Sequence, residues 1–251
     1  MAKKTTAKKA PEKKQKGPKL EKQDNWLTRQ VKRTRWWFWR GAIWAASITI
    51  FAVLLYIIVD PPTTWTMRSE KARIGEVDYQ WIDIDEVAPV FLRSVVAAED
   101  ANFCLHWGFD VAAIRAALDE GGRRGASTLT QQTVKNAYLW QGRSWIRKSI
   151  ETLLTPLIEI AWTKRRILEI YVNIAEFDEG VFGVDAAAHH YFGVEPADLS
   201  ALQAARLAAV LPAPKTRSAS KPNSVVRNRA AAIMDGAATI RKDRRSTCFE
   251  D

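Results

Sequence analysis

The 251-residue chain contains few cysteines, shows no P-loop and has no internal repeat. Its two cysteines, Cys104 and Cys248, are too few for a disulfide framework or a cysteine-based metal cluster. The pair could form one bridge in an oxidising compartment, but we expect two unpaired thiols. The missing P-loop and repeat give no support for a P-loop nucleotide-binding protein or a solenoid.

An excess of positive charge is also missing from most of the chain, despite a formal net charge of +10. Residues 1–40 hold 14 Lys and Arg against 3 Asp and Glu, which leaves 24 basic and 25 acidic residues for 41–251. Because this larger part is almost neutral, the charge does not indicate nucleic-acid binding. Residues 2–24 are lysine-rich with almost no apolar side chain, so we predict a disordered basic tail over 1–40.

An uncharged run of 19 residues, 41–59, follows the basic segment. As a helix it would be about 28 Å long, close to the roughly 30 Å thickness of bilayer hydrocarbon. A tryptophan-rich segment (36–39) precedes it and a Pro-Pro pair (61–62) follows it, which favours a membrane span over a buried core helix. No small-x-small cleavage site follows Val59, so we predict an uncleaved transmembrane helix rather than a signal peptide.

The distribution of basic residues predicts the orientation of this span. Lys and Arg are concentrated on its N-terminal side, so we expect the N-terminus in the cytoplasm and residues 61–251 in the periplasm or outside. Residues 60–83 are predicted to be a stalk, and residues 84–251 to be the functional domain.

The predicted domain is mainly α-helical. Apolar residues recur with the helical period in eight runs that are separated by Gly, Pro or Asp/Asn signals. The runs cover about 86–98, 110–119, 128–140, 145–162, 164–174, 183–192, 198–211 and 222–239.

A carboxylate ends the apolar stripe of the first run. Leu92, Val95, Val96 and Glu99 have the i, i+3, i+4 and i+7 spacing of one helix face, so Glu99 is predicted to point inward. Burial raises the pKa of a glutamate toward neutrality, the condition for general acid or base catalysis. The alternative is an ordinary helix-end glutamate that turns out to water.

Four residues of the next segment are interpreted as structural residues near this carboxylate. They are Asp100, Phe103, His106 and Gly108, which follow Glu99 at short fixed spacing. A lone histidine beside a turn is more often a hydrogen-bonding strut than a catalyst, so we interpret the imidazole in this way.

Two further segments combine polar and cationic side chains. Residues 125–136 (GASTLTQQTVKN) enter a helix, and a helix N-terminus offers free N–H groups suited to phosphate. Capping alone could account for the hydroxyl residues, but not for two glutamines and a lysine together. In residues 143–151 (RSWIRKSIE), Glu151 lies on one helix face with Arg147 and Lys148, which suits a pyrophosphate cradle but also an ordinary surface ion-pair helix.

Five segments, in order, resemble the signature blocks of glycosyltransferase family 51. They are EDANFCLHWG (99–108), GASTLTQQTVKN (125–136), RKSIE (147–151), KRRILEIYVNIAEF (164–177) and AARLAAVLPAP (204–214). Within that family the chain is most similar to the monofunctional biosynthetic peptidoglycan transglycosylases. The resemblance covers about residues 80–215 and implies a lysozyme-like fold, mainly α, with a small membrane-dipping lobe.

The resemblance also implies roles for individual residues. Glu99 corresponds to the general base and Glu151 to the second catalytic carboxylate. The substrate-binding residues implied by these segments are Ser127, Thr128, Gln131, Gln132, Lys135, Asn136, Arg143, Arg147 and Lys148.

The expected function is therefore polymerisation of lipid II at the bacterial inner membrane by a single-pass enzyme with a periplasmic domain. The expected partners are lipid II, the growing glycan chain, the membrane and penicillin-binding or division proteins, with no nucleic acid. The sequence requires no cofactor and leaves the metal question open, although a divalent cation (Mg or Mn) could bridge pyrophosphate and carboxylate.

Two alternatives remain open at this point. A lysozyme-like hydrolase also uses two carboxylates around a sugar cleft, but does not require the cationic segment. A non-catalytic membrane adaptor of the cell-wall machinery would need neither carboxylate. The motif Ser218-Ala-Ser-Lys221 matches the S-x-x-K of penicillin-binding modules only by its letters, because no S-x-N or K-T-G partner exists, so no transpeptidase module is expected.

Overall fold

The computed structural model describes residues 26–121, 125–142 and 144–250. The chain divides into two units, residues 1–49 and residues 50–251, which we describe separately. Helix α1 (Trp26–Leu55) runs through the first unit and into the beginning of the second.

Helix α1 corrects the predicted limits of the tail and the span. It begins at Trp26, so residues 26–40 are helical rather than disordered, while residues 1–25 lie outside the described part. Its segment Thr28–Leu55 is long and apolar enough to cross a membrane. Large apolar side chains along it, including Trp44 and Ile48, are exposed, as expected for a helix surrounded by lipid.

The eight predicted helical runs all occur in the second unit, each within a few residues of its expected limits. They are α3 (Pro89–Glu99), α4 (Val111–Asp119), α5 (Leu129–Tyr138), α6 (Trp145–Ala161), α7 (Lys164–Ile174), α8 (Gly183–Phe192), α9 (Ala201–Val210) and α10 (Ser224–Lys242). Additional elements are α2 (Trp65–Ile74), α11 (Thr247–Glu250) and the short 3-10 turns η1 (Ile84–Glu86), η2 (Phe103–Leu105), η3 (Pro196–Asp198) and η4 (Pro214–Thr216).

The helices begin where the sequence supplies capping side chains. Asp110, Thr128, Ser144, Thr163 and Ser200 each accept a hydrogen bond from a backbone N–H in the first turn of the helix that follows. Such caps satisfy N–H groups that have no partner inside the helix, and each stabilises it by about 1 kcal/mol.

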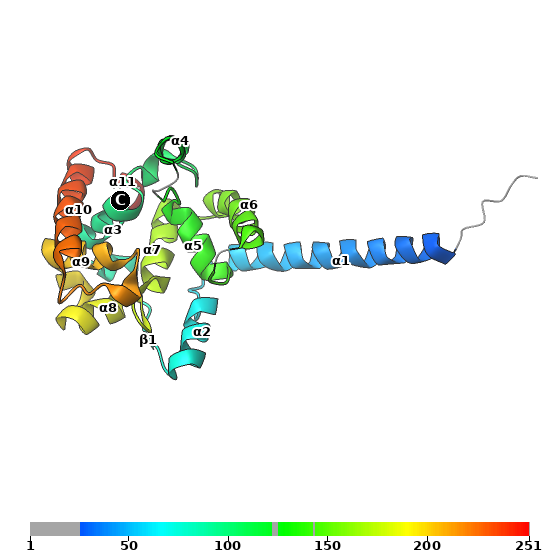
Figure 1. The fold of residues 1–251 in the computed structure, drawn as a ribbon, viewed down its shortest axis with the longest axis horizontal. Coiled ribbons are helices and arrows are strands. Elements are labelled where there is room, and N and C mark those ends of the chain that lie inside the picture. Colours follow the sequence, from blue (N-terminus) through cyan, green and yellow to red (C-terminus); the bar gives the residue numbers. More distant parts are fainter. Residues whose placement is uncertain (1–25, 122–124, 143, 251) are drawn as a thin grey trace, which may run out of the picture. The chain divides into compact units, whose positions relative to one another are not determined.

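Two groups of helices pack around the site described below (Figure 1). Helices α3, α9 and α10 contact one another, and α5 contacts both α6 and α7. Their shared core includes fully buried aromatic side chains such as Phe91, Phe177 and Tyr171. The mainly α, lysozyme-like class that we predicted is confirmed.

A small three-stranded sheet, which we did not predict, lies beside α8. Its order is β1 (Asp78–Tyr79), β3 (Val181–Phe182) and β2 (Glu176–Asp178), with β1 parallel and β2 antiparallel to β3. The chain can enter α8 directly from β3 because Gly183 has φ +83° and approaches the backbone oxygen of Asn173 closely.

The segment predicted as a stalk, residues 60–83, belongs to the body of the second unit. The Glu70 carboxylate of α2 is buried and accepts hydrogen bonds from Arg73 (2.5 Å) and Lys215 (2.6 Å). Gln141 Nε2 donates to Thr66 Oγ1 at 2.8 Å. Helix α2 is therefore a wall of the domain rather than a spacer.

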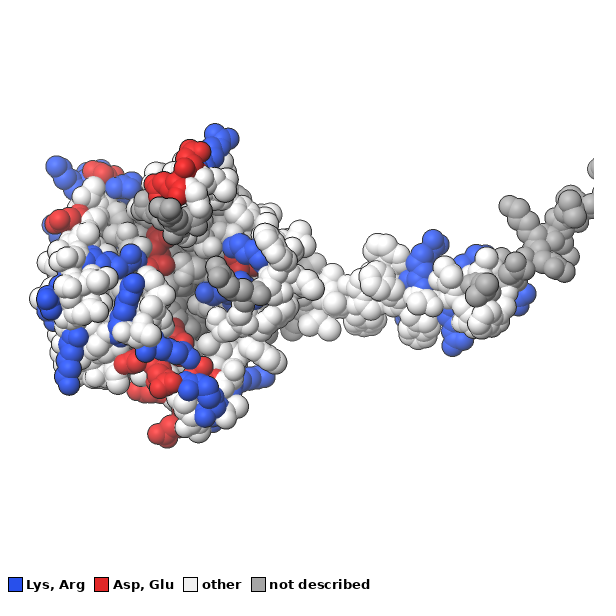
Figure 2. Space-filling view, viewed as in Figure 1, with Lys and Arg blue, Asp and Glu red and all other residues white. Residues whose placement is uncertain are grey.

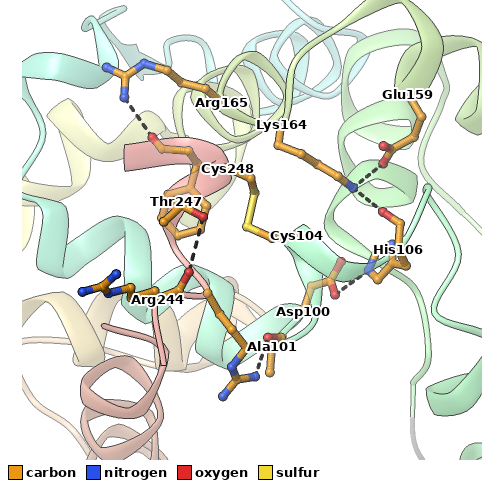
Figure 3. Close-up of a disulfide and its surroundings, with 12 residues drawn as sticks. Asp100, Ala101, Cys104, His106, Glu159, Lys164, Arg165, Arg244, Thr247 and Cys248 are labelled. Carbon is orange, nitrogen blue, oxygen red and sulfur yellow. Dashed lines mark hydrogen bonds and ion pairs between the residues drawn. A yellow bond between two sulfur atoms is a disulfide. The ribbon is translucent and has the colours of Figure 1, made fainter. Parts of the chain in front are cut away.

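The two cysteines also differ from our expectation of free thiols. Cys104 in η2 and Cys248 in α11 form a disulfide, although 144 residues separate them in the sequence (Figure 3). The bridge forms because the chain after α10 folds back and buries Phe249 completely.

Candidate active site

Glu99 is the last residue of α3 and points into the domain as predicted. Leu92, Val95 and Val96 of the same face are buried, and the Glu99 side chain is only 12% exposed. Burial raises the pKa of the Glu99 carboxyl, against the lowering effects of a hydrogen bond from Gln132 and of three nearby cations. The carboxyl is thus a candidate general base or acid.

Gln132 of α5 and Tyr171 of α7 hold this carboxyl in place. Gln132 Nε2 donates to Glu99 Oε2 at 2.9 Å, and Tyr171 Oη donates to Gln132 Oε1 at 3.3 Å. Tyr171 is fully buried and burial raises its pKa well above the ordinary value, so it stays a neutral donor. The chain Tyr171–Gln132–Glu99 therefore fixes the amide orientation and leaves Glu99 Oε1 for other partners.

Asp100 and His106 form a strut beneath the site, as we expected for the structural residues. Asp100 Oδ1 lies 2.9 Å from His106 Nε2, and Asp100 Oδ2 accepts a hydrogen bond from Leu129 N at 2.9 Å. This second bond ties the end of α3 to the start of α5. Phe103 is fully buried beneath it.

Gly108 allows α6 to approach the same turn. Its φ is +78°, and a Cβ there would lie 2.6 Å from Thr155 Cγ2. Its carbonyl oxygen accepts a hydrogen bond from Thr128 Oγ1 at 2.7 Å. The glycine is therefore required both by backbone conformation and by space.

The second carboxylate, Glu151, lies with two cations on the inner face of α6. Arg147 Nη1 is 2.7 Å from Glu151 Oε2, and Lys148 Nζ also pairs with the carboxylate while contacting Ser127 Oγ at 3.3 Å. The Glu151 side chain is 3% exposed, whereas Lys148 is 39% exposed. Arg143, the fourth expected cation, lies outside the described residues.

Lys135 of α5 connects the two carboxylates electrostatically. Burial lowers the pKa of its ammonium group, while the negative charges of Glu151 and Glu99 oppose this lowering. Both carboxylates are therefore within electrostatic range of one amine, and we define the group of Lys135, Arg147, Lys148 and Glu151 as the cationic cradle.

Thr128 and Gln131 cap the N-terminus of α5. They form a capping box, in which Thr128 Oγ1 accepts from Gln131 N and Gln131 Oε1 accepts from Thr128 N. Both side chains are buried. Our argument that capping does not account for the glutamines therefore fails for Gln131, while Gln132 does face Glu99.

Two hollows are lined by the two partners of the Glu99–Gln132 hydrogen bond, the first by Glu99 and the second by Gln132. The first, of about 240 Å³, is lined by Glu99, Asp110, Ser127 and the alanine face of α4. The second, of about 380 Å³, is lined by groups from four regions of the domain: Thr66, Glu70, Gln132, Lys135, Asn136, Gln141, Tyr171, Glu176 and Lys215 among them. Figure 2 shows Lys and Arg side chains and Asp and Glu side chains around a hollow on one face of the second unit.

Two groups of side chains in the described part have metal-ligating types and spacing, Asp100–His106–Asp110 and Asp185–His189–Glu195. In the first group every carboxylate oxygen already accepts a hydrogen bond, from His106, Leu129 N, Ala113 N or Asn102. In the second, His189 and Glu195 are largely exposed. Neither group contains Glu99 or Glu151, and the Glu151 carboxylate of the cradle is already paired with two cations.

Sequence reasoning missed Arg229 of α10, whose side chain pairs with the second carboxylate oxygen of Glu99. Its Nη2 lies 3.4 Å from Glu99 Oε1 and donates to the carbonyl oxygen of Ala98 at 3.2 Å. No local pattern indicates this role, because 130 residues separate the two side chains and Arg229 lies outside the five recognised segments.

Comparison with known proteins agrees with this geometry. The family model described as Transglycosylase matches residues 67–238. The chain belongs to the transglycosylase family. The match contains both carboxylates and all five recognised segments, and it ends before α11.

Three proteins called biosynthetic peptidoglycan transglycosylase illustrate this membership of the transglycosylase family. The protein of Jannaschia sp. (strain CCS1) is 54% identical over 215 residues, which cover 86% of this chain and 90% of the relative. The protein of Rhodospirillum centenum (strain ATCC 51521 / SW) is 45% identical, with coverages of 82% and 91%. The protein of Xanthomonas campestris pv. campestris (strain B100) is 44% identical, with coverages of 82% and 88%.

Proposed function

We propose that this transglycosylase polymerises lipid II into β-1,4 glycan strands for bacterial cell-wall synthesis and releases undecaprenyl pyrophosphate. The observation that carries the proposal is the placement of a buried carboxylate with a raised pKa, Glu99, beside a cationic cradle in one site. Glycan polymerisation from a lipid pyrophosphate needs both parts. A hydrolase acting on uncharged glycosidic bonds needs only the carboxylates.

The chemistry is a single displacement. Glu99 accepts the proton of the 4-hydroxyl of the incoming disaccharide as that oxygen forms a bond to the anomeric carbon of the growing chain. The bond from the anomeric carbon to the pyrophosphate oxygen breaks at the same time. Because the attack is opposite an α-linked leaving group, the new linkage is β.

The cationic cradle stabilises the leaving group. Lys135, Arg147 and Lys148 would offer N–H donors to the pyrophosphate oxygens, where negative charge accumulates in the transition state. Glu151 orients two of these cations through its ion pairs. The opposing effect of the two carboxylates on the pKa of Lys135 favours the charged form that this role requires.

A divalent cation, Mg or Mn, would have to be held mainly by the phosphate oxygens of the substrate, because the carboxylate of the cradle is already paired. We therefore derive no step through a metal. Turnover before and after chelation, and after adding back each ion, tests this point.

The membrane proposal is supported from two sides. The C-terminal end of α1 is bound to the domain, since Trp162 Nε1 donates to Val53 O at 2.8 Å. Helix α6, which carries Glu151 inward, exposes apolar side chains outward, with Trp145 90%, Leu153 72% and Ile160 72% exposed. We propose that this outer face dips into the bilayer, so that the cradle lies close to lipid phosphates.

The orientation proposed is a cytoplasmic N-terminus and a periplasmic domain at the inner membrane. The basic residues before the span support it, and so does the Cys104–Cys248 disulfide, because disulfides persist in oxidising compartments. Protease added to intact spheroplasts should degrade residues 60–251, and protection of this part would contradict the orientation. Penicillin-binding or division proteins are proposed as partners, to be sought by co-purification from membranes.

The deciding experiment uses the purified full-length protein with fluorescent lipid II, resolving chain products by length. Polymer formation is expected. Soluble fragments released from finished cell-wall glycan would favour the hydrolase instead. Full complementation by a Glu99→Gln, Glu151→Gln double variant would favour the non-catalytic adaptor.

A further inference from the structure

The last seven described residues, 244–250, fold back onto the segment that follows the proposed base. We call these residues the C-terminal clasp and residues 100–106 the catalytic turn. Cys248 of the clasp is bonded to Cys104 of the turn, and the fully buried Phe249 ring lies 6.4 Å from the Phe103 ring, centroid to centroid. Figure 3 shows the bond between Cys248 and Cys104 and the positions of Asp100, Ala101 and His106 on the turn.

Polar contacts attach the clasp at three further points. Arg245 Nη1 donates to the carbonyl oxygen of Ala101 at 3.0 Å, within the catalytic turn. The other two hold the clasp itself: Arg165 Nη1 donates to Phe249 O at 2.8 Å, and Arg93 Nη1 pairs with Glu250 Oε1 at 2.6 Å. Arg93 lies on α3 and Arg165 on α7, so the clasp is fixed both to the group of α3, α9 and α10 and to the group of α5, α6 and α7.

The catalytic turn in turn fixes the relation between α3 and α5. Asp100 binds both His106 Nε2 and Leu129 N. On the other side of the turn, Lys164 Nζ donates to His106 O at 2.8 Å and pairs with Glu159 Oε1 at 2.9 Å. Because α5 carries Gln132, a shift of the turn would change the geometry between Gln132 and Glu99.

We propose that the C-terminal clasp is a positioning element of the active site, which holds the catalytic turn so that Glu99 stays hydrogen-bonded to Gln132, and that its disulfide makes this geometry dependent on an oxidising environment. The kinetic part rests on the proposed polymerase function. The clasp lies beyond the segment that matches the transglycosylase family, residues 67–238. A simple staple would stabilise the fold without affecting the base, and the experiments below distinguish the two.

The kinetic test compares the full-length wild type with the Cys104→Ser, Cys248→Ser variant in detergent. We expect kcat to fall about ten- to a hundredfold, since a displacement of about 1 Å costs up to about a hundredfold. The KM for lipid II should change by less than about threefold, because three of the four cradle residues, Arg147, Lys148 and Glu151, lie on α6 rather than on α5. Reductant should produce the same loss in the wild type and none in the variant.

The pH profile of kcat separates positioning from loss of folded protein. Opening the turn would admit water against the burial that raises the pKa of Glu99 and would weaken the Gln132 hydrogen bond that lowers it, so the acid limb of kcat should move. The charged and titratable groups that face Glu99 from the packed elements are Lys135, Arg229, Arg217 and Tyr171, and none of them is changed in the variant. A smaller amount of folded enzyme would lower kcat without moving the limb.

A matched pair of arginine variants keeps the disulfide intact. Arg245→Ala removes the bond to Ala101 O and should lower kcat several-fold with the same acid-limb shift. Arg241→Ala, in the last turn of α10 and without a hydrogen bond from its side chain in the described part, should leave both unchanged. This pair remains informative if the serine variant does not fold.

Hydrogen–deuterium exchange tests the clasp independently of turnover. Amides of residues 100–106 and 128–132 should exchange faster in the serine variant, in Arg245→Ala and in the reduced wild type, well below the unfolding temperature. Unchanged exchange in these segments, with an unmoved acid limb and a kcat within about twofold of the wild type, would overturn the proposal even if the variant melts earlier. If the wild type makes no polymer, the proposed function fails, while the exchange result still decides whether the clasp holds the turn.

Discussion

Replacing Glu99 by glutamine should stop polymerisation and stabilise the protein at the same time. The amide has nearly the shape of the carboxylate, and its oxygen can still accept the 2.9 Å hydrogen bond from Gln132. The variant therefore removes the proton acceptor without disturbing the chain Tyr171–Gln132–residue 99. Lipid II binding should remain, since the cradle is unchanged.

The expected loss of turnover follows from the role of a general base. Such a base contributes about a hundred- to ten-thousandfold of rate, or about 2.7 to 5.5 kcal/mol of barrier. Loss of the ion pair between Arg229 and residue 99 should contribute little to the fall in turnover, because its atoms are 3.4 Å apart and the Arg229 side chain is 35% exposed. A variant that retains more than about a tenth of wild-type turnover would refute the role of Glu99.

The stability effect has a definite sign and pH window. The folded state raises the pKa of Glu99 above the ordinary value of 4.5, so ionising this group costs the folded state free energy. The cost is absent well below pH 4.5, grows as the pH rises toward the folded pKa and is complete above it. Glu99→Gln should therefore melt at a higher temperature than the wild type near pH 8, with little difference near pH 3.

Two assays on the same preparations check both parts. Chain products from fluorescent lipid II give the turnover, and intrinsic tryptophan fluorescence gives the melting temperature at each pH. Glu86→Gln serves as the matched control, because Glu86 is exposed at the end of η1 and should change neither property. A lower melting temperature for Glu99→Gln near pH 8 would contradict the desolvation argument.

Three further substitutions test other parts of the site and fold. Lys135→Ala should lower kcat/KM for lipid II about ten- to a hundredfold, because hydrogen bonds to charged groups contribute about 1.5–3 kcal/mol, and unchanged dependence on donor concentration would count against the cradle. Arg229→Ala removes a cation that lowers the pKa of Glu99, so the acid limb of the activity profile should move to higher pH, and a shift to lower pH would refute the contact. Gly183→Ala places a Cβ 2.8 Å from the backbone oxygen of Asn173 at φ +83° and should lower the melting temperature. The decrease should be larger than for Gly193→Ala, where φ is +63° but no atom lies within 4 Å. Equal decreases would mean that the backbone near Asn173 moves to make room for the Cβ.

The helical body could be predicted well because its signals are local. Each run of α3 to α10 alternates apolar and polar residues with the helical period, and side chains such as Ser144 and Thr163 mark the beginnings. The strands were not predictable in the same way. With two or three residues each they are too short to show alternation.

The limits of the N-terminal helix show how composition can mislead. Lysine-rich residues 2–24 favour disorder, and we extended that expectation to residue 40. The segment from Trp26 onward contains Leu, Gln, Lys and Arg, which are good helix formers, and it continues directly into the apolar span. A basic segment at the end of a transmembrane helix can therefore remain helical.

The site was predictable where residues act within one helix, and was not where distant segments meet. The pairing of Glu151 with Arg147 and Lys148 follows from i, i+3 and i, i+4 spacing. The contact between Glu99 and Arg229 joins α3 to α10, and the disulfide joins η2 to α11. Neither spacing has a local signature, so only the packing of the helices brings these groups together.

The base and the cradle are electrostatically coupled, because Lys135 of the cradle interacts with both Glu99 and Glu151. Lys135 lowers the pKa of Glu99, while Glu99 and Glu151 together oppose the burial that lowers the pKa of Lys135. A pyrophosphate that takes up the positive charge of Lys135 would leave Glu99 with fewer opposing cations and a stronger affinity for a proton. Donor binding in the cradle would thus strengthen the base at the moment when the acceptor hydroxyl must lose its proton, which is a physical reason for placing Lys135 of α5 within electrostatic range of both carboxylates.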